Sequence, residues 1–489
     1  MSMTNLAVVG AGAMGAGIAQ IGLSAGCNVI LFDLDSAARE RARVAILDRL
    51  KRLVEKGVHP EGFAGHADGR LTLASQLADL APADVVIEAI VERLDAKQAL
   101  FAELESIVRD DAILATNTSS LSVAAIARDC RLKARVCGLH FFNPVPVMKL
   151  VEVIVHPGTD PAVRDAAVAF SHRLGKVPVI VRDGPGFLVN LGGRAYVTEA
   201  LHAAEEQVAG VAEIDAILRD GAGFRMGPFE LMDLTGIDVN FAATSFIYAG
   251  YQHDPRIKTT TLHAAMFNAG RFGRKTGAGF HEYNDQTVAP TEEPISEATG
   301  FRFRLPEPIA GMDRLRGGEA AVADDAPVAL VAPLGEDAAT VTARLDLDPA
   351  EVVAIDLTGI ERDHVTLMQP LGGSNAAVLC AGWLRSQGYK VSVIRDSPGF
   401  ILQRVLAMIA NLGCEMAQIG IGSPDDVDTA MKLAQNYPLG PFEIVERLGA
   451  RQTLHILQQL QATTGSDRYR PSLWLRRRAL LNRPIREAD

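Results

Sequence analysis

One histidine and one glutamate, twelve residues apart, carry the clearest chemical signal in this sequence. His140 lies in an apolar run at 138–142, Glu152 lies in a second apolar run at 150–155, and an Asn-Pro-Val-Pro turn separates the two runs. Read as strand, turn and strand, this segment brings an imidazole and a carboxylate together at one end of a sheet. A base with an orienting carboxylate is what the removal of a proton from an alcohol requires. A single pair of this kind is often only structural. Whether this pair is catalytic or structural therefore has to be inferred from the other motifs in the sequence.

A glycine-rich turn near the N-terminus is the second motif. Gly10, Gly12 and Gly15 follow a buried strand predicted at 5–9 and open a charge-poor helix predicted at 14–25. In this context the first glycine allows a tight turn, the second lets a pyrophosphate approach the backbone, and the third permits close packing of helix on strand. The spacing alone also fits a simple tight turn, but its position between strand and helix predicts a dinucleotide site.

Asp33 closes the second predicted strand, 18 residues after Gly15. A carboxylate at this place accepts hydrogen bonds from the ribose of an unphosphorylated adenosine and repels a 2′-phosphate. We therefore expect NAD as the cofactor rather than NADP. Arg39 and Arg41 lie nearby in the sequence and leave tolerance of NADP open, and Asp33 could alternatively cap the helix that follows.

A polar turn and one isolated asparagine could complete the site. Asn117 and Ser119 belong to an Asn-Thr-Ser-Ser run between a predicted strand and an apolar helical stretch. In a structural interpretation one of these residues caps the helix. In a functional interpretation their side chains enter the crevice at the carboxyl ends of the strands, where ligands bind in such folds. Asn190, just inside the helical region that follows, could reach the same crevice.

The predicted elements change in kind along the chain. Strands and helices alternate over 1–184, which indicates a doubly wound, Rossmann-like α/β domain that binds NAD. Residues 185–284 are helical only, and 285–325 are rich in Pro, Glu, Gly and Ala, as expected of a linker. Short strand-like runs within 326–395 indicate a degenerate small α/β segment, and 396–489 are helical again.

The helical region occurs twice. The motif Asp183-Gly-Pro-Gly-Phe187 recurs as Asp396-Ser-Pro-Gly-Phe400, and Gly227-Pro-Phe-Glu230 recurs as Gly440-Pro-Phe-Glu443. The residue numbers in both pairs differ by 213 (396 − 183 and 440 − 227), so no gap falls between the two matches. We call this difference the repeat offset. Agreement at one spacing indicates a duplicated all-α domain.

The second copy lacks the chemical motifs. The chain holds no second glycine-rich turn, Asn-Thr-Ser-Ser run or His…Glu block, and Gln403 stands at the counterpart of Asn190. We therefore expect one active site per chain. We also expect the second helical copy to pack on the first as a covalent substitute for a dimer partner. A monomer with this internal pseudo-dimer and a homodimer both stay open.

The bulk properties exclude several classes of protein. A chain of 489 residues is too long for one core, and a net charge of −11 argues against a general nucleic-acid binder. No apolar run reaches the length of about 18 residues that a membrane span needs. Five scattered cysteines show no ligand spacing and fit reduced thiols, so no metal site is expected. With no targeting segment in view, we expect a cytoplasmic protein.

Taken together, the motifs resemble the L-3-hydroxyacyl-CoA dehydrogenase family. The resemblance runs from residue 5 to about 283. The blocks that carry it are the glycine-rich turn, Ile-Glu-Ala-Ile-Val-Glu at 87–92, the Asn-Thr-Ser-Ser run at 117–120, the block from His140 to Glu152, Pro-Gly-Phe-Leu-Val-Asn at 185–190, and Gly-Pro-Phe-Glu at 227–230. Because independent blocks agree in order, the catalytic interpretation of His140 is favoured over the structural one.

The resemblance implies a role for each matching residue. His140 would be the general base that takes the proton of the 3-hydroxyl, and Glu152 would orient its imidazole. Ser119 and Asn190 would hydrogen-bond the substrate oxygen. The other implied contacts are those of Asp33, Glu92, Lys97 and Asn117 with the dinucleotide, and that of Lys51, on the helix predicted at 36–56, with a phosphate of CoA.

The implied function is the NAD-dependent oxidation of an L-3-hydroxyacyl-CoA to the 3-oxoacyl-CoA, in fatty-acid or aromatic-acid (phenylacetate-type) degradation. The acyl chain stays open between groups such as hydroxybutyryl and the dicarboxylic hydroxyadipyl. One alternative is a dehydrogenase for a free hydroxy acid. Another is a catalytically silent, cofactor-binding structural protein of the same fold, although the joint presence of the implied catalytic residues argues against it.

Overall fold

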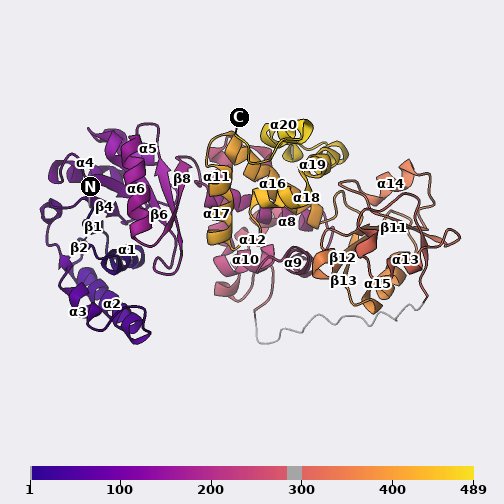
Figure 1. Ribbon diagram of the computed structural model, residues 1–489, viewed down its shortest axis with the longest axis horizontal. Coiled ribbons are helices and arrows are strands. Elements are labelled where there is room, and N and C mark those ends of the chain that lie inside the picture. The colour runs from indigo at the N-terminus through magenta and orange to yellow at the C-terminus, as the bar shows by residue number, and fades with distance from the viewer. Residues whose placement is uncertain (1–2, 284–299, 489) are drawn as a thin grey trace. The chain divides into compact units, whose positions relative to one another are not determined.

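The computed structural model describes residues 3–283 and 300–488, and the chain forms two compact units (Figure 1). The first unit comprises Met1–Leu191 and Gly420–Gln435, and the second comprises Gly192–Ile419 and Asn436–Asp489. A short piece of the C-terminal half therefore belongs to the same unit as the N-terminal domain.

The first unit is built on an eight-stranded sheet. The strand order is β3-β2-β1-β4-β5-β6-β7-β8, and all neighbours are parallel except the pair β6 and β7. The strands are β1 (Asn5–Val9), β2 (Asn28–Phe32), β3 (Leu71–Leu73), β4 (Val85–Glu88), β5 (Ile113–Thr116), β6 (Val136–Phe141), β7 (Leu150–Val155) and β8 (Val177–Arg182). The order reverses between β1 and β4, which creates the crevice typical of nucleotide-binding sheets. The expected doubly wound domain is confirmed.

Helices accompany the strands of this sheet (Figure 1). They are α1 (Ala13–Ser24), α2 (Ser36–Glu55), α3 (Phe63–Asp68), α4 (Leu94–Ile107), α5 (Val123–Ile126), α6 (Pro161–Arg173) and α7 (Val189–Gly192). Helix α1 carries no charge because residues 15–23 are all buried. Helix α2 buries only the stripe Ala42, Ile46 and Leu50, so its other faces can carry charge.

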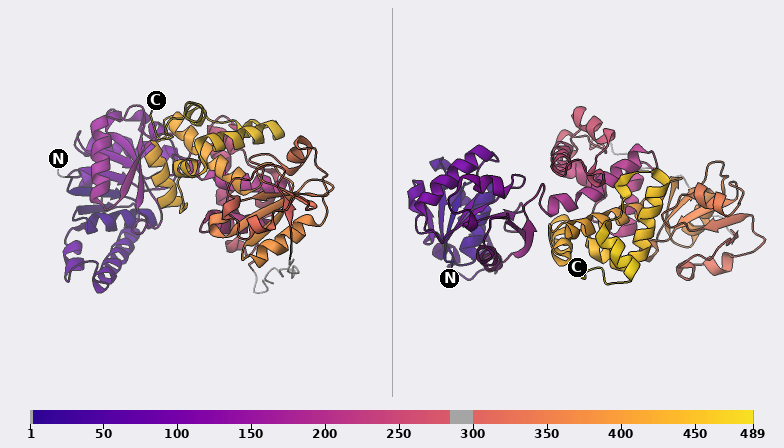
Figure 2. Two further views of the ribbon diagram at one scale, coloured as in Figure 1. Left: turned by 45° about the vertical axis from the view of Figure 1, so that its right-hand side comes forward. Right: turned by 90° about the horizontal axis from the view of Figure 1, so that it is seen from above.

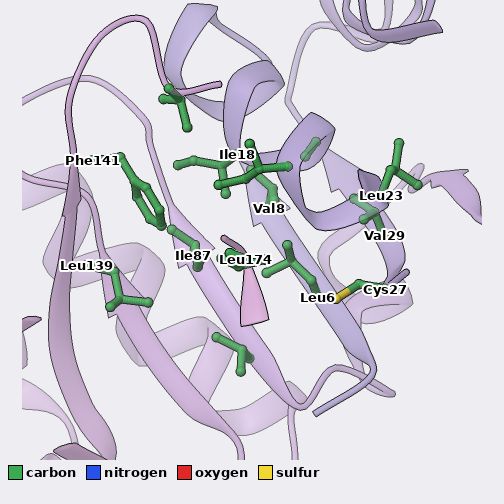
Figure 3. Close-up of a cluster of buried hydrophobic side chains, with 14 of the residues drawn as sticks. Leu6, Val8, Ile18, Leu23, Cys27, Val29, Ile87, Leu139, Phe141 and Leu174 are labelled. Carbon is green, nitrogen blue, oxygen red and sulfur yellow. The ribbon is translucent and has the colours of Figure 1, made fainter. Parts of the chain in front are cut away.

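One part of the core of the first unit lies on a single face of the sheet, the face that packs against α1. Residues that point to the other face, such as Ala7 and Val9, are buried as well. Leu6, Val8, Val29 and Leu139 are completely buried, and Figure 3 shows them packed with side chains of α1 such as Ile18. Strands that are covered on both faces need continuous apolar runs, which explains why these segments do not alternate between apolar and polar residues.

The second unit contains helices of both sequence repeats. The first copy supplies α8 (Arg194–Glu205), α9 (Val211–Ala216), α10 (Pro228–Thr235), α11 (Ile237–Gly250) and α12 (Thr261–Asn268). The second copy supplies α16 (Leu402–Gln418), α18 (Pro441–Leu448), α19 (Ala450–Thr464) and α20 (Leu473–Leu481). The first residues of α10 and α11 precede those of α18 and α19 by the repeat offset (441 − 228 and 450 − 237). The duplication is confirmed, and α8 of one copy packs against α16 of the other (Figures 1 and 2).

Each helical copy also makes a backbone hydrogen bond with the last residue of a sheet's edge strand, β8 in one sheet and β13 in the other. Helix α17 (Pro424–Gln435) of the second copy packs on β7 and β8 in the first unit, where Arg182 donates its backbone N–H to the carbonyl of Ile421 at 2.9 Å. In the second unit, Arg395 donates its backbone N–H to the carbonyl of Val208 at 2.9 Å, just before α9. Both partners are shifted by the repeat offset (395 − 182 and 421 − 208). Such reciprocal contacts are typical of a two-fold, isologous interface.

A smaller five-stranded sheet completes the second unit. It has the order β13-β12-β11-β10-β9 and one antiparallel pair, β11 and β12. Its elements are β9 (Phe303–Arg304), α13 (Gly318–Ala321), β10 (Val328–Val331), α14 (Ala338–Arg344), β11 (Val352–Asp356), β12 (His364–Gln369), α15 (Ala376–Ser386) and β13 (Lys390–Arg395). This is the strand order and the sense of β8-β7-β6-β5-β4 in the larger sheet.

Part of the predicted linker is structured. Residues 300–325 contain β9 and α13, whose buried side chains join the core of the small sheet, and residues 285–299 lie outside the described residues. The strand in this segment is only two residues long. So short a strand leaves no periodic pattern in the sequence, and the composition alone therefore suggested a linker. Within the described ranges no helix combines the length and the apolar character that a membrane crossing needs.

Candidate active site

The structure pairs His140 with Glu152. His140 lies on β6 and Glu152 directly opposite on the antiparallel strand β7. The imidazole Nδ1 is 2.6 Å from Glu152 Oε2, and both side chains are buried. Because the carboxylate accepts a hydrogen bond from Nδ1–H, the other ring nitrogen, Nε2, keeps its lone pair and is free to act as a base.

The carboxylate of Glu152 is itself held in place. Its second oxygen, Oε1, accepts the backbone N–H groups of Leu188 at 3.0 Å and Val189 at 2.9 Å. These amides lie at the start of α7, where N–H groups lack partners within the helix and favour an anion. Both oxygens of the buried carboxylate are thereby satisfied, which fixes the ring of His140.

A cavity of about 340 Å³ opens beside His140. Its lining includes four residues that the sequence singled out, namely Glu92, Lys97, Asn117 and Ser119. The rings of Phe142 and Phe187 lie 4.5 and 5.8 Å from the imidazole, between ring centroids, and form an apolar wall. Asn190 lies on α7, one residue after Val189 and its bond to Glu152. The sheet thus brings these residues to the carboxyl ends of β4, β5 and β6.

The Asn-Thr-Ser-Ser turn is organised by Glu92. The carboxylate accepts the hydroxyl of Thr118 at 2.6 Å and the backbone N–H of Ser119 at 2.9 Å. Burial by itself would raise the pKa of Glu92, but the Thr118 hydroxyl and the Lys97 ammonium outweigh it and lower the pKa to about 2. Asn117 uses its side-chain oxygen to accept the backbone N–H of Phe141 at 2.8 Å, which ties the ends of β5 and β6 together.

Sequence reasoning missed Glu88, at the end of β4. Its completely buried carboxylate accepts the Lys97 ammonium at 2.7 Å, the Thr116 hydroxyl at 2.7 Å and the backbone N–H of Ile90 at 2.7 Å. Lys97 also lies 3.0 Å from Glu92. The signal was an acidic residue that ends an otherwise apolar strand, a position at which a buried charge requires a partner.

The glycine-rich turn forms an open cradle at the start of α1. A Cβ on Gly10, whose φ is +109°, would lie 2.5 Å from the carbonyl oxygen of Ala89, and one on Gly15 would lie 1.8 Å from the carbonyl oxygen of Gly10. At Gly12, by contrast, no described atom comes within 4 Å of the Cβ position. Close packing on two sides and open space on the third fit the pyrophosphate of a dinucleotide.

Asp33 supports the same turn. Its Oδ2 accepts the backbone N–H of Ala11 at 2.7 Å, and its Oδ1 accepts that of Asp35 at 3.0 Å. The helix cap of α2 is Asp35 rather than Asp33, so the capping alternative for Asp33 is wrong. The carboxylate lies at the end of β2, beside the glycine cradle.

A second, larger cavity of about 730 Å³ lies between α1, α2 and the 143–147 turn. Its basic lining comprises Arg49, Arg52, Lys56, His59, Arg173 and Lys176. The side-chain oxygen of Gln20, another lining residue, is buried and has no hydrogen-bond partner among the described residues. Lys51 does not belong to this lining, because its side chain is 65% exposed and lies 3.8 Å from Asp48.

Comparisons with known proteins agree with this geometry. Residues 5–184 match the family model of the 3-hydroxyacyl-CoA dehydrogenase NAD-binding domain, and residues 186–283 and 399–489 match that of the C-terminal domain. The chain is 38% identical to the 3-hydroxyadipyl-CoA dehydrogenase of Escherichia coli K12, over 98% of each protein. It is 39% identical to the 3-hydroxybutyryl-CoA dehydrogenase of Clostridioides difficile, over 57% of this chain and 99% of the relative.

A solved structure extends the similarity to the whole fold. The crystal structure of 3-hydroxybutyryl-CoA dehydrogenase from E. coli K12 superposes with a TM-score of 0.88 at 38% identity, covering 98% of this chain and 99% of that one. The similarity therefore includes the small sheet and the second helical copy.

Proposed function

The chain belongs to the 3-hydroxyacyl-CoA dehydrogenase family, an NAD-dependent group of oxidoreductases acting on CH–OH, and on this basis we propose that it oxidises an L-3-hydroxyacyl-CoA with His140 as the general base. The observation that carries the proposal is the 2.6 Å contact between the buried imidazole and Glu152. Glu152 accepts a hydrogen bond from the Nδ1–H group, so that the unprotonated Nε2 takes the proton from the 3-hydroxyl. The positive charge that the imidazole gains is then stabilised by the carboxylate.

Ser119 and Asn190 position the substrate in this proposal. Ser119 lines the cavity beside His140, and Asn190 follows the α7 amides that hold Glu152. Hydrogen bonds from a hydroxyl and an amide to the 3-oxygen would hold the substrate carbon within reach of the cofactor, and such positioning contributes a large part of catalysis. NAD, when bound, accepts the hydride from this carbon.

We assign the cofactor contacts to the residues around the glycine cradle. Gly10, Gly12 and Gly15 would admit the pyrophosphate, and Asp33 would accept the adenosine ribose hydroxyls. Asn117 lines the His140 cavity and would contact the nicotinamide end. Glu92 and Lys97 line it too, but since they pair with each other at 3.0 Å, their contribution to NAD binding is mainly to hold the turn at 117–120.

The basic cavity supports a CoA thioester rather than a free hydroxy acid. Arg49 and Arg52 of α2 and Lys56, which follows its last residue, line a cavity of about 730 Å³, which is larger than a short hydroxy acid needs. Clustered cations match the phosphates of CoA. Arg49, Arg52 and Lys56 take the place of Lys51, which the sequence resemblance had suggested for this role.

Two acyl groups are the first candidates for the substrate. The full-length relative named for 3-hydroxyadipyl-CoA and the structure named for 3-hydroxybutyryl-CoA make these two thioesters the first candidates. A place in aromatic-acid degradation follows from the first and one in fatty-acid metabolism from the second.

An assay of NADH consumption separates the proposed function from its alternatives. We expect acetoacetyl-CoA and 3-oxoadipyl-CoA to oxidise NADH, with free acetoacetate at least a hundredfold poorer in kcat/KM. Comparable rates with the free acid would favour the hydroxy-acid dehydrogenase. NADH binding without turnover of any thioester would favour the catalytically silent structural protein.

A further inference from the structure

The small sheet of the second unit contains a cavity of its own, of about 330 Å³. It lies at the carboxyl ends of β10 and β11, and its lining includes Pro333, Asp356 and Gln403. The dehydrogenase reaction uses none of these residues. What the cavity corresponds to can be read from the register of the strands.

Asp356 occupies the position that corresponds to His140. In the large sheet, His140 pairs with Glu152, and Glu152 pairs with Val179 on β8. In the small sheet, Asp356 pairs with Thr366, and Thr366 pairs with Ser392 on β13. Ser392 follows Val179 by the repeat offset of the helical copies (392 − 179).

The remaining parts of the active site also have counterparts here. Gln403 follows Asn190 by the same offset, and Thr366 stands for Glu152. The loop after β10 contributes Ala332, Pro333 and Leu334 to this cavity. The corresponding loop after β5 contributes polar residues such as Asn117 and Ser119 to the cavity beside His140. The cavity is therefore the duplicated active-site crevice with its catalytic residues replaced.

One oxygen atom of Asp356, in the lining of this crevice, has no hydrogen-bond partner among the described residues. Asp356 is 2% exposed, and its Oδ1 accepts the Thr358 hydroxyl at 2.6 Å and the Gln403 amide at 3.1 Å. Its Oδ2 is buried and has no hydrogen-bond partner among the described residues. Burial raises the pKa of Asp356 and favours the protonated acid. A neutral carboxyl group donates one hydrogen bond, and an unused buried donor destabilises the fold unless a ligand accepts it.

Gln403 fixes the orientation of this acid. Its side-chain oxygen accepts the backbone N–H of Gly335 at 2.9 Å, and its amide also donates to the carbonyl of Pro333 at 3.2 Å. The oxygen and the amide of Gln403 are both engaged, so Gln403 serves as a support, and Asp356 Oδ2 is left as the unpaired polar atom of the lining.

The lining adds a net positive charge. Arg314 and Arg447 both line the cavity and share a single carboxylate, that of Glu361, at 3.4 and 3.3 Å. With the buried Asp356 protonated, the two guanidinium groups and the carboxylate of Glu361 leave one positive charge in excess in the lining, which favours an anion over a cation.

We propose that this cavity is a second ligand site, which binds a small carboxylate whose other end offers a carbonyl or hydroxyl oxygen to Asp356. The carboxylate meets Arg314 and Arg447, and the oxygen acceptor takes the hydrogen bond of the buried acid. This inference does not rest on the proposed dehydrogenase function, because none of its residues belongs to that site.

Binding of matched small molecules to the full-length protein tests the proposal. The probes are 4-oxopentanoate, which has both groups, pentanoate, which lacks the carbonyl, and pentylamine, which reverses the charge. With saturating NADH present, titration calorimetry should give the order 4-oxopentanoate, pentanoate, pentylamine in falling affinity. The same affinities in the His140→Gln variant would place the binding outside the dehydrogenase site. No binding of the first probe, or tighter binding of the amine, would overturn the proposal.

Two variants of Asp356 distinguish a donor from a charge. Asp356→Leu should weaken 4-oxopentanoate at least about tenfold, since it removes the hydrogen bond. Asp356→Asn keeps an N–H donor and should stay within about threefold of the wild type. Equal affinity in the Leu variant contradicts the site.

A third variant tests the charged lining without touching the buried acid. Glu361→Gln releases both arginines and should tighten pentanoate several-fold at low salt, and an unchanged or weaker affinity argues against the assigned carboxylate position. This variant also decides the matter if Asp356→Leu fails to fold, as judged by its thermal unfolding.

Discussion

The two sheets of this protein share strand order and sense but differ at one pair of positions. The large sheet places His140 opposite Glu152, whereas the small sheet places Asp356 opposite Thr366. An imidazole held by a carboxylate is an arrangement suited to proton transfer, whereas Asp356 stands opposite an uncharged threonine. The strand arrangement has therefore been kept through duplication while the proton-transfer pair has not.

The two helical copies also share their arrangement and differ in one set of residues. Their contacts with the sheets are reciprocal, as Arg182 with Ile421 and Arg395 with Val208 show, but one buried cluster of charged residues that joins the copies has no charged counterpart at the positions related by the repeat offset. Glu199 of α8 accepts Arg404 of α16 at 2.5 Å and Arg468 at 2.6 Å.

The sequence counterparts of this cluster are apolar. The repeat offset pairs Glu199 with Leu412, Arg404 with Leu191 and Arg468 with Pro255. In a homodimer of identical chains, each position holds the same residue in both subunits, so the two symmetry-related contacts would have to use the same side chains. Covalent linkage removes that constraint, and so the fused interface could become asymmetric.

Removal of the second half should have the largest effect. A fragment ending at Tyr283 loses α16, the partner of α8, and exposes an apolar helix face. We expect this fragment to dimerise or aggregate, measured by light scattering after size-exclusion chromatography, whereas the full chain should be monomeric. A soluble, monomeric fragment with undiminished thermal stability would show that the second copy is not a substitute for a dimer partner.

His140→Gln should lower turnover by roughly 10²- to 10⁴-fold, the range that general-base catalysis contributes. Glutamine keeps much of the size and polarity of the imidazole but cannot take the proton. NADH binding, followed by fluorescence, should remain within a few-fold of the wild type, because His140 does not belong to the glycine cradle. Near-normal turnover would contradict the role of His140 as the general base.

Glu199→Gln should destabilise the second unit by about 3–5 kcal/mol, since it leaves two buried guanidinium groups without their common carboxylate. Glu206→Gln is the matched control, because Glu206 contacts the same Arg404 at 2.7 Å but is half exposed. Its cost should be below about 1 kcal/mol. Equal effects in denaturant titrations would argue that the asymmetric cluster does not hold the copies together.

The pH dependence of this difference has a defined sign. Burial raises the pKa of Glu199, but Arg468 and Arg404 outweigh it and hold the pKa well below its ordinary value of 4.5. A depressed pKa in the folded state means that the stabilisation is complete above about pH 4.5 and is lost as the pH falls further. The stability gap between wild type and Glu199→Gln should shrink in acid, and a gap that widens there would contradict the assignment.

Substitutions of lysines on α2 or directly after it should have the smallest effect. Lys56→Ala is expected to raise the KM for an acyl-CoA several-fold at low salt, with kcat nearly unchanged, because a screened contact with a phosphate is worth about 1 kcal/mol. Lys51→Ala, which removes a lysine outside the basic cavity, is the matched control. A larger KM change in Lys51→Ala would restore the assignment suggested by sequence resemblance.

Much of the first domain could be read from the chain because its signals are local. Apolar runs predicted the strands that carry His140 and Glu152, and the glycine spacing predicted the cradle before α1. Strands β3, β9 and β12 were not foreseen; β3 and β9 are only three and two residues long, whereas β12 has six residues. Short strands carry too little pattern, since their existence depends on neighbours in the sheet.

The order of residues along the chain was enough to establish the duplication, its constant offset and the single occurrence of the His…Glu block, because repeats and motif order are properties of the chain. Packing in three dimensions was needed to establish that Glu88 supports Lys97, that Arg49, Arg52 and Lys56 rather than Lys51 line the basic cavity, and that Asp356 stands in the place of His140. These facts depend on strand register and on which side of a helix faces a cavity. Both are fixed by packing between segments far apart in the sequence, where local patterns carry no information.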